Sequence, residues 1–232
     1  MNKKTKLVIA EVFCVVFLTA FLSPKDKWTS LFDGKNVSGW HSYQKDKVVG
    51  WNVEDGTLVP DGTGGDLVTD KEYENFDLEF DFKIPKGSNS GVVYKVIENP
   101  DLRSTYMSGP EYQIIDDKGY LNEKGEIYPL KPTQLSGANY DMIPPANLNA
   151  VKPAGEWNKG RIVVNNNHVE HFLNGKKVAD YQYGSDDWKA MVAKSKFKDW
   201  AYATPHAKGK IALQNHNPRE KVWFRNIRIK EL

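Results

Sequence analysis

The chain has almost no cysteine. Among 232 residues Cys14 is the only one, and it lies in the apolar N-terminal segment. If that segment is removed, the mature chain can form no disulfide and has neither a thiol nucleophile nor a thiolate metal ligand. Cys14 does not follow a Leu-x-Ala/Gly sequence, which argues against lipoprotein attachment.

The chain also lacks a clear excess of either charge. The formal +2 belongs to the first 23 residues, because residues 24–232 carry 29 basic and 29 acidic side chains. A neutral mature chain argues against nucleic acid or an anionic membrane surface as the main partner, since both require a clustered positive excess. The five histidines are scattered and contain no His-x-x-x-His spacing, so no metal motif of that kind is present.

Basic residues followed by a short apolar run begin the chain. Lys3, Lys4 and Lys6 precede the apolar residues 7–22, and Ser23 opens a polar stretch. This order predicts a signal peptide at residues 1–23. The run is about 16 residues long and contains Glu11, whereas roughly 20 apolar residues span a bilayer, so a retained anchor is the less favoured alternative. We expect an exported protein, periplasmic or on the cell surface, without stable membrane insertion after signal removal.

Past residue 27 the apolar residues recur with a period of two. Residues 77–84 alternate polar and apolar side chains, as in a strand with one face on a core. Further strands are predicted at 90–96, 111–116, 161–165, 168–173, 210–214 and 222–230, with tight turns at Asn165–Asn167 and Leu173–Lys176. A helical pattern is confined to residues 186–196. The sequence predicts an all-β antiparallel sandwich that forms one domain over residues 24–232.

The stretch from residue 99 to 158 interrupts this rhythm. It contains seven of the twelve prolines and five tyrosines, and only one convincing strand, at 111–116. Long irregular segments in a compact domain are usually functional loops carried by a rigid sheet. We therefore predict that the binding site lies there.

Eight motifs resemble those of one known family. They are Trp28–Asn36 with Gly39-Trp40, Trp51–Leu58, Asn89–Val93, Glu111–Asp116, Gly155–Asn158, Leu173–Gly175, Leu213–His216 and Phe224–Ile227. In this order and spacing the chain is similar to the DUF1080 family of 3-keto-disaccharide hydrolases, also called 3-keto-glucoside 1,2-lyase and 3-keto-2-hydroxy-glucal hydratase domains. The resemblance covers nearly the whole mature chain. It implies a concanavalin A-like jelly-roll β-sandwich that cleaves glycosides whose sugar is oxidised at carbon 3.

The implied reaction follows from the chemistry of such a sugar. A ketone at C3 acidifies the C2 proton, so a base can remove it and expel the aglycone from C1 by elimination. Water added to the resulting enone completes a net hydrolysis. The site needs a base near neutral pKa, donors or a cation for the enolate, and an acid for the leaving oxygen. No cofactor is certain, and a divalent cation at Glu111 is left open.

His216 is the first candidate for the base. Gln214 and His216 are two residues apart at the end of a strand, so they face one side of the sheet, and Gln214 becomes a substrate-binding candidate. Imidazole titrates near pH 7, although a histidine in a surface turn is the alternative. Relatives usually carry Asp-His-Gly where this chain has Asn215-His216-Asn217.

The other catalytic candidates are Glu111 and Lys95. Glu111 and Gln113 share one face of their strand and Asp116 ends it, which indicates either a cleft or a solvated sheet face. Glu111 could act as the acid, and Gln113 and Asp116 could bind sugar hydroxyls. Lys95 stands where relatives often have arginine and would bring a cation to the enolate, unless it is a solvated strand lysine.

Three further residues are predicted to bind substrate. Tyr140 is the best aromatic for stacking on a sugar, Asn89 could donate to a hydroxyl or satisfy turn backbone, and Arg225 could bind sugar or pair with a surface acid. His168 and His171 fall on opposite faces of one strand, so we discount them as a metal pair.

Two other functions compete with the lyase or hydrolase. A non-catalytic carbohydrate-binding module on a lectin-like fold explains the tyrosine-rich loops equally well. A conventional glycosidase of the laminarinase type needs Glu-x-Asp-x-x-Glu, and the nearest sequence, residues 79–83, lacks the second glutamate. The predicted partner is an oxidised glycoside or disaccharide.

Overall fold

A computed structural model describes residues 27–122, 124–216 and 221–232. The predicted signal peptide at residues 1–23 lies outside these residues. Among the residues described, no helix is long and apolar enough to cross a membrane.

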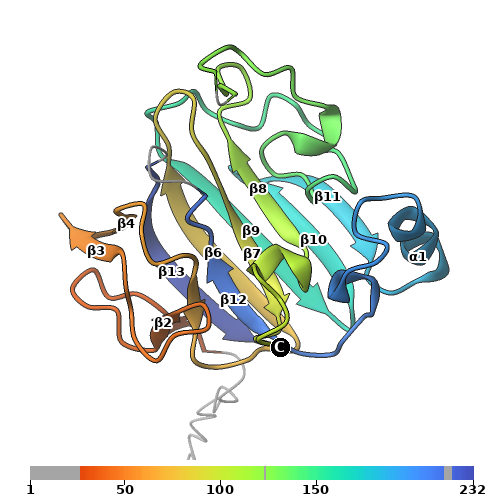
Figure 1. The fold of residues 1–232 in the computed structure, drawn as a ribbon, viewed down its shortest axis with the longest axis horizontal. Coiled ribbons are helices and arrows are strands. Elements are labelled where there is room, and N and C mark those ends of the chain that lie inside the picture. Colours follow the sequence, from red (N-terminus) through yellow and green to blue (C-terminus); the bar gives the residue numbers. More distant parts are fainter. Residues whose placement is uncertain (1–26, 123, 217–220) are drawn as a thin grey trace, which may run out of the picture.

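Two antiparallel sheets face each other and form a β-sandwich (Figure 1). The larger sheet has the order β11-β10-β9-β6-β13-β4-β3 with β1 added to β13, and the smaller has the order β2-β5-β12-β7-β8. The strands are β1 (Thr29–Ser30), β2 (Trp40–Ser42), β3 (Trp51–Glu54), β4 (Thr57–Pro60), β5 (Leu67–Thr69), β6 (Phe76–Lys83), β7 (Asn89–Val96), β8 (Glu111–Ile115), β9 (Asn158–Asn165), β10 (His168–Leu173), β11 (Lys176–Gln182), β12 (Lys210–Leu213) and β13 (Trp223–Glu231). The predicted all-β antiparallel sandwich is confirmed.

Alternation along β6 shows why these residues form a strand. Phe76, Leu78, Phe80 and Phe82 are almost fully buried between the sheets, while the residues between them face outward. Tyr94 and Tyr112 pack against this row from the smaller sheet with edge-to-face ring contacts. Burial of such side chains contributes about 1.5–3 kcal/mol each, so the core is built mainly from aromatic rings.

Tight turns and one short helix complete the fold. Asn174 and Gly175 both adopt positive φ between β10 and β11, as the predicted Asn-Gly turn requires. Helix α1 (Asp186–Ala193) begins after Ser185, whose hydroxyl accepts the Trp188 N–H. The 3-10 turns are η2 (Thr105–Met107), η3 (Pro132–Gln134) and η4 (Ala201–Ala203).

The outer face of the smaller sheet is partly covered by loops. Val68, Val93, Val96 and Ala212 form a buried cluster there with Tyr43, away from the main core. The Tyr43 hydroxyl donates to the carbonyls of Ile97 and Leu102, which ties the segment before η2 over this cluster. The polar side chains of the candidate site lie on this same outer face.

Candidate active site

Polar side chains gather on the outer face of the smaller sheet where β7, β8 and β12 meet. Glu111 lies opposite Val93, and Gln113 lies opposite Gly91, so the predicted shared face of Glu111 and Gln113 is confirmed. The Gln214 N–H donates to the Gly91 carbonyl at 2.9 Å, which brings the end of β12 beside them. Gln113 and Gln214 are both almost fully buried.

Glu111 is held against the backbone of Gly91. A Cβ atom at Gly91 would come within 2.4 Å of Glu111 Oε1, so only glycine leaves room for this carboxylate. Glu111 is 7% exposed. Burial raises its pKa to about 8; His216 and Lys196 oppose the increase, and Asp66 and Asp141 add to it. At neutral pH the side chain is therefore mostly a protonated acid.

Asp66 is a site residue that the sequence analysis missed. It precedes β5, and its carboxylate accepts the Thr105 hydroxyl at 2.5 Å and the Asn215 N–H at 2.9 Å. Burial raises the pKa of Asp66, while its electrostatic interaction with His216 opposes the increase. A carboxylate from the residue before β5 therefore lies near His216, although residue 215 itself is asparagine. The only sequence feature that could have indicated Asp66 is its position as a polar residue between paired glycines and an apolar run.

Tyr140, Asp141 and Lys196 form the neighbouring wall. The Tyr140 N–H donates to the Glu111 carbonyl at 3.0 Å, which fixes this loop to the edge of β8. Lys196 Nζ lies 4.3 Å from the centre of the Tyr140 ring and 3.1 Å from Asp141 Oδ2. Burial raises the pKa of the Tyr140 hydroxyl, and Lys196 opposes that shift. Tyr140 thus lies beside Glu111, its role in stacking on a sugar stays a prediction, and Lys196 is an unpredicted cation next to it.

Lys95 lies elsewhere. Its side chain is fully buried and donates to the carbonyls of His206 and Ala207, and its ammonium lies 5.5 Å from the centre of the Tyr183 ring. Burial lowers its pKa to about 8. The alternative of a solvated strand lysine is wrong, and these contacts do not bring Lys95 to Glu111.

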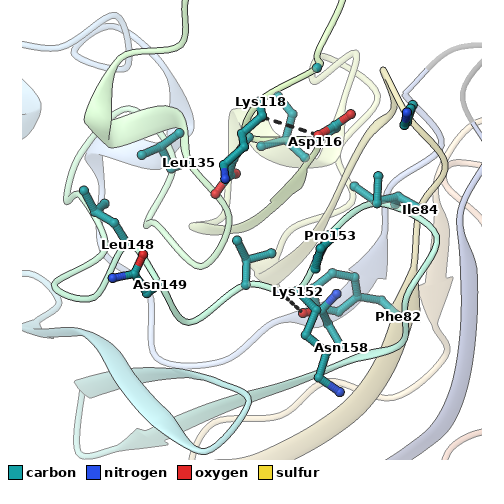
Figure 2. Close-up of a pocket in the computed structure, with 16 residues that line it drawn as sticks. Phe82, Ile84, Asp116, Lys118, Leu135, Leu148, Asn149, Lys152, Pro153 and Asn158 are labelled. Carbon is teal, nitrogen blue, oxygen red and sulfur yellow. Dashed lines mark hydrogen bonds between the residues drawn. The ribbon is translucent and has the colours of Figure 1, made fainter.

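Two predicted substrate-binding residues are also separated from Glu111. Arg225 lies on β13 in the other sheet, where Nε is 3.5 Å from Asp81 Oδ2 and the guanidinium carbon is 3.8 Å from the centre of the Trp157 ring. Asp116 follows the opposite end of β8 and accepts the Gly87 N–H at 3.0 Å. It lines a separate cavity (Figure 2). Asp116 therefore does not share a site with Glu111, and for Arg225 the alternative of a surface ion pair is confirmed.

The amide residues offer hydrogen-bonding groups to a ligand. Gln214 Oε1 is buried without a hydrogen-bond partner in the described chain, which is an uncommon state for a buried acceptor. Gln113 Oε1 accepts the Ile114 N–H at 3.2 Å. Asn89 begins β7 on the same face, opposite Ile115.

The described residues contain no group of three or more His, Cys, Asp or Glu that could hold a metal ion. His168 is exposed and pairs with Asp180, whereas His171 is buried and bonded to the Tyr94 hydroxyl, so the predicted opposite faces are confirmed. Burial lowers the pKa of His171 to about 4. It is a neutral core residue beneath the smaller sheet.

Comparison with known proteins gives the same family as the eight sequence motifs. Residues 27–230 match the model of the 3-keto-alpha-glucoside-1,2-lyase-like domain. A 3-keto-disaccharide hydrolase of Bacteroides thetaiotaomicron is 36% identical over 236 residues, which cover 89% of this chain and 79% of that protein. Two solved structures from Parabacteroides distasonis, described as candidate glycosyl hydrolases, share 40% and 32% identity with TM-scores of 0.81 and 0.68. They cover 88% and 89% of this chain, and 94% and 100% of their own.

Proposed function

The chain belongs to the family of 3-keto-alpha-glucoside-1,2-lyase-like domains, and from this membership we propose that it cleaves the glycosidic bond of 3-keto-disaccharides and related 3-keto-glycosides. The observation that carries the mechanism is Glu111, a buried carboxyl group whose pKa is about 8, with His216 and Lys196 in electrostatic range. One acid, one imidazole and one ammonium are the groups that an elimination across C1–C2 requires.

The reaction divides between these residues. His216 removes the proton from C2, and the electron pair moves into the C3 carbonyl to form an enolate. Lys196 stabilises the negative oxygen. When the enolate collapses, the C1–O bond breaks and the protonated Glu111 donates its proton to the departing oxygen. Water then adds across the enone, its hydroxyl to C1 and its proton to C2, which gives the 3-keto sugar and completes a net hydrolysis.

Solvent isotope incorporation tests the elimination directly. We expect turnover of a 3-keto-disaccharide in ²H₂O to place deuterium at C2 of the released 3-keto sugar, measured by ¹H NMR at early times. A control incubation of the 3-keto sugar without enzyme measures spontaneous exchange. Direct attack of water at C1 leaves C2 protonated at early times, and that result would exclude elimination.

Substrate selectivity distinguishes the alternatives. We expect cleavage of the 3-keto-disaccharide and none of its unoxidised parent, with His216→Ala slowing the reaction ~10²-fold or more. Cleavage of the parent would identify a conventional glycosidase, and binding without turnover would identify a carbohydrate-binding module. Parallel assays with EDTA test whether a divalent cation contributes.

We also propose export of the mature chain to the periplasm or the cell surface. The support is the order of Lys3, Lys4, Lys6 and the apolar residues 7–22. Fractionation of cells that express the full chain, with mass spectrometry of its N-terminus, tests this: we expect a product that begins near residue 24 outside the cytoplasm. An intact N-terminus in the cytoplasmic fraction would refute it.

A further inference from the structure

A cavity lies at the end of β8 opposite Glu111. Its volume is about 730 Å³, within the roughly 300–1,000 Å³ range of small-molecule sites. Ile115 and Asp116 line it, whereas Glu111 begins the same strand about 13 Å away at 3.4 Å per residue. The cavity is therefore separate from the candidate active site.

The walls of this cavity are aliphatic. Leu135, Leu148 and Val151 line it, and Leu148 is 62% exposed although it is a large apolar residue. Phe82 is the one aromatic lining residue, and its side chain is fully buried at the floor. No ring face is offered on which a sugar could stack, so the lining favours an aliphatic body over a carbohydrate.

The charged lining residues give the cavity a positive balance. It contains three lysines, Lys86, Lys118 and Lys152, and two carboxylates, Asp116 and Asp117. The three lysines have no ion pair within 4 Å among the described residues. Lys152 Nζ donates to the Trp157 carbonyl at 3.1 Å.

The two carboxylates are already engaged by the backbone. Asp116 accepts the Gly87 N–H at 3.0 Å, and Asp117 accepts the Ser136 N–H at 2.8 Å. Asp117 is the acid whose charge interacts with Lys118. In Figure 2 Lys118 extends from the chain beside Asp116, on the side toward Leu135, and Lys152 lies across the cavity near Asn158. The two carboxylates are thus held by the backbone, and the three exposed lysines outnumber them around the cavity.

We propose that this cavity binds an amphipathic organic anion, an aliphatic carboxylate whose chain packs on Leu135, Leu148 and Val151 and whose head group is attracted by the positive charge of Lys118 on one side of the cavity and Lys152 on the other. Burial of the chain supplies the affinity, which increases with each buried CH₂, and the lysines supply the selectivity for an anion. The site goes beyond the proposed catalysis, because it uses none of the residues around Glu111.

Calorimetric titration with octanoate tests the proposal without any turnover. The full-length mature protein should bind one octanoate, and the charge-removing variant Lys118→Gln/Lys152→Gln should bind it about tenfold more weakly. The matched variant Lys176→Gln/Lys194→Gln removes two exposed lysines elsewhere and should bind as the wild type does. Ala154→Trp fills the cavity and should abolish binding.

Two further probes decide the chemistry. 1-Octanol has the same chain without the charge and should bind more weakly than octanoate, and maltose should not compete. The proposal is overturned by absence of octanoate binding, by equal affinity for 1-octanol, by competition from maltose, or by equal losses in the two lysine double variants. Unfolding temperatures of all variants verify that each is folded. If Ala154→Trp does not fold, the comparison of the two lysine double variants tests the proposal by itself.

Discussion

Glu111 has the ionisation that defines the candidate site. Burial raises its pKa to about 8, against 4.5 for an ordinary glutamate. We expect kcat/KM of the wild type to fall as pH rises through about 8, because the acid that protonates the leaving oxygen is lost. Glu111→Gln should lower the rate ~10²-fold and remove this limb of the pH profile. A limb that persists in the variant would assign the titration to another group.

Unfolding measurements provide a readout of the same group that is independent of catalysis. The unfolded chain releases the Glu111 proton near pH 4.5, whereas the folded chain keeps it until about 8. The unfolding free energy of the wild type should therefore decrease, relative to Glu111→Gln, as pH rises from about 4.5 to about 8. A difference between the two proteins that does not change with pH would show that the carboxyl group titrates normally.

Gly91 makes the position of this carboxylate possible. Its φ is outside the left-handed range, so alanine is acceptable to the backbone, but the new Cβ would lie 2.4 Å from Glu111 Oε1. Gly91→Ala should cost about 1–3 kcal/mol of unfolding free energy and reduce activity. In a Glu111→Ala background the same change should cost little, because the conflict is gone. Equal costs in both backgrounds, from urea unfolding, would contradict the contact.

At the scale of elements, strands with clear alternation could be predicted, whereas the fully buried β5 could not. Strands β6 and β10 follow from alternation within a single segment, because one face meets the core and the other meets solvent. Strand β5 has three residues, all buried, since loops cover its outer face. No local pattern indicates such a strand, and Asp66 beside it was missed for that reason.

Lys95 was misplaced because β7 contains a bulge. Two residues separate Val93 from Val96, whereas one separates their partners Ala212 and Lys210, and Lys95 adopts φ +55°. The extra residue shifts the alternation, so a side chain expected on the site face is directed to Tyr183 and the carbonyls of His206 and Ala207. Counting by twos from Asn89 cannot detect this change.

Replacement of Lys95 should affect stability rather than catalysis. The folded chain releases the Lys95 proton near pH 8 and the unfolded chain near 10.5, so the unfolding free energy of the wild type should rise across this interval. Lys95→Met should lack that rise while its kcat/KM stays within about threefold of wild type, and exposed Lys176→Met is the control. A large loss of kcat/KM with an unchanged fold would return Lys95 to the active site.

At the scale of the whole molecule, charge acts locally. Residues 24–232 carry 29 basic and 29 acidic side chains, and the proposed substrate is uncharged. A neutral protein provides no net field to steer such a substrate, while the Glu111 group is buried and only weakly screened by salt. We expect kcat/KM of the mature chain for a neutral 3-keto-disaccharide to change less than about twofold between low and high ionic strength. By contrast, octanoate binding at the cavity lined by Ile115 and Asp116 should weaken as salt is added, because its lysines are exposed. A steep salt dependence of catalysis would instead indicate a charged substrate, and hence a different glycoside from the one proposed.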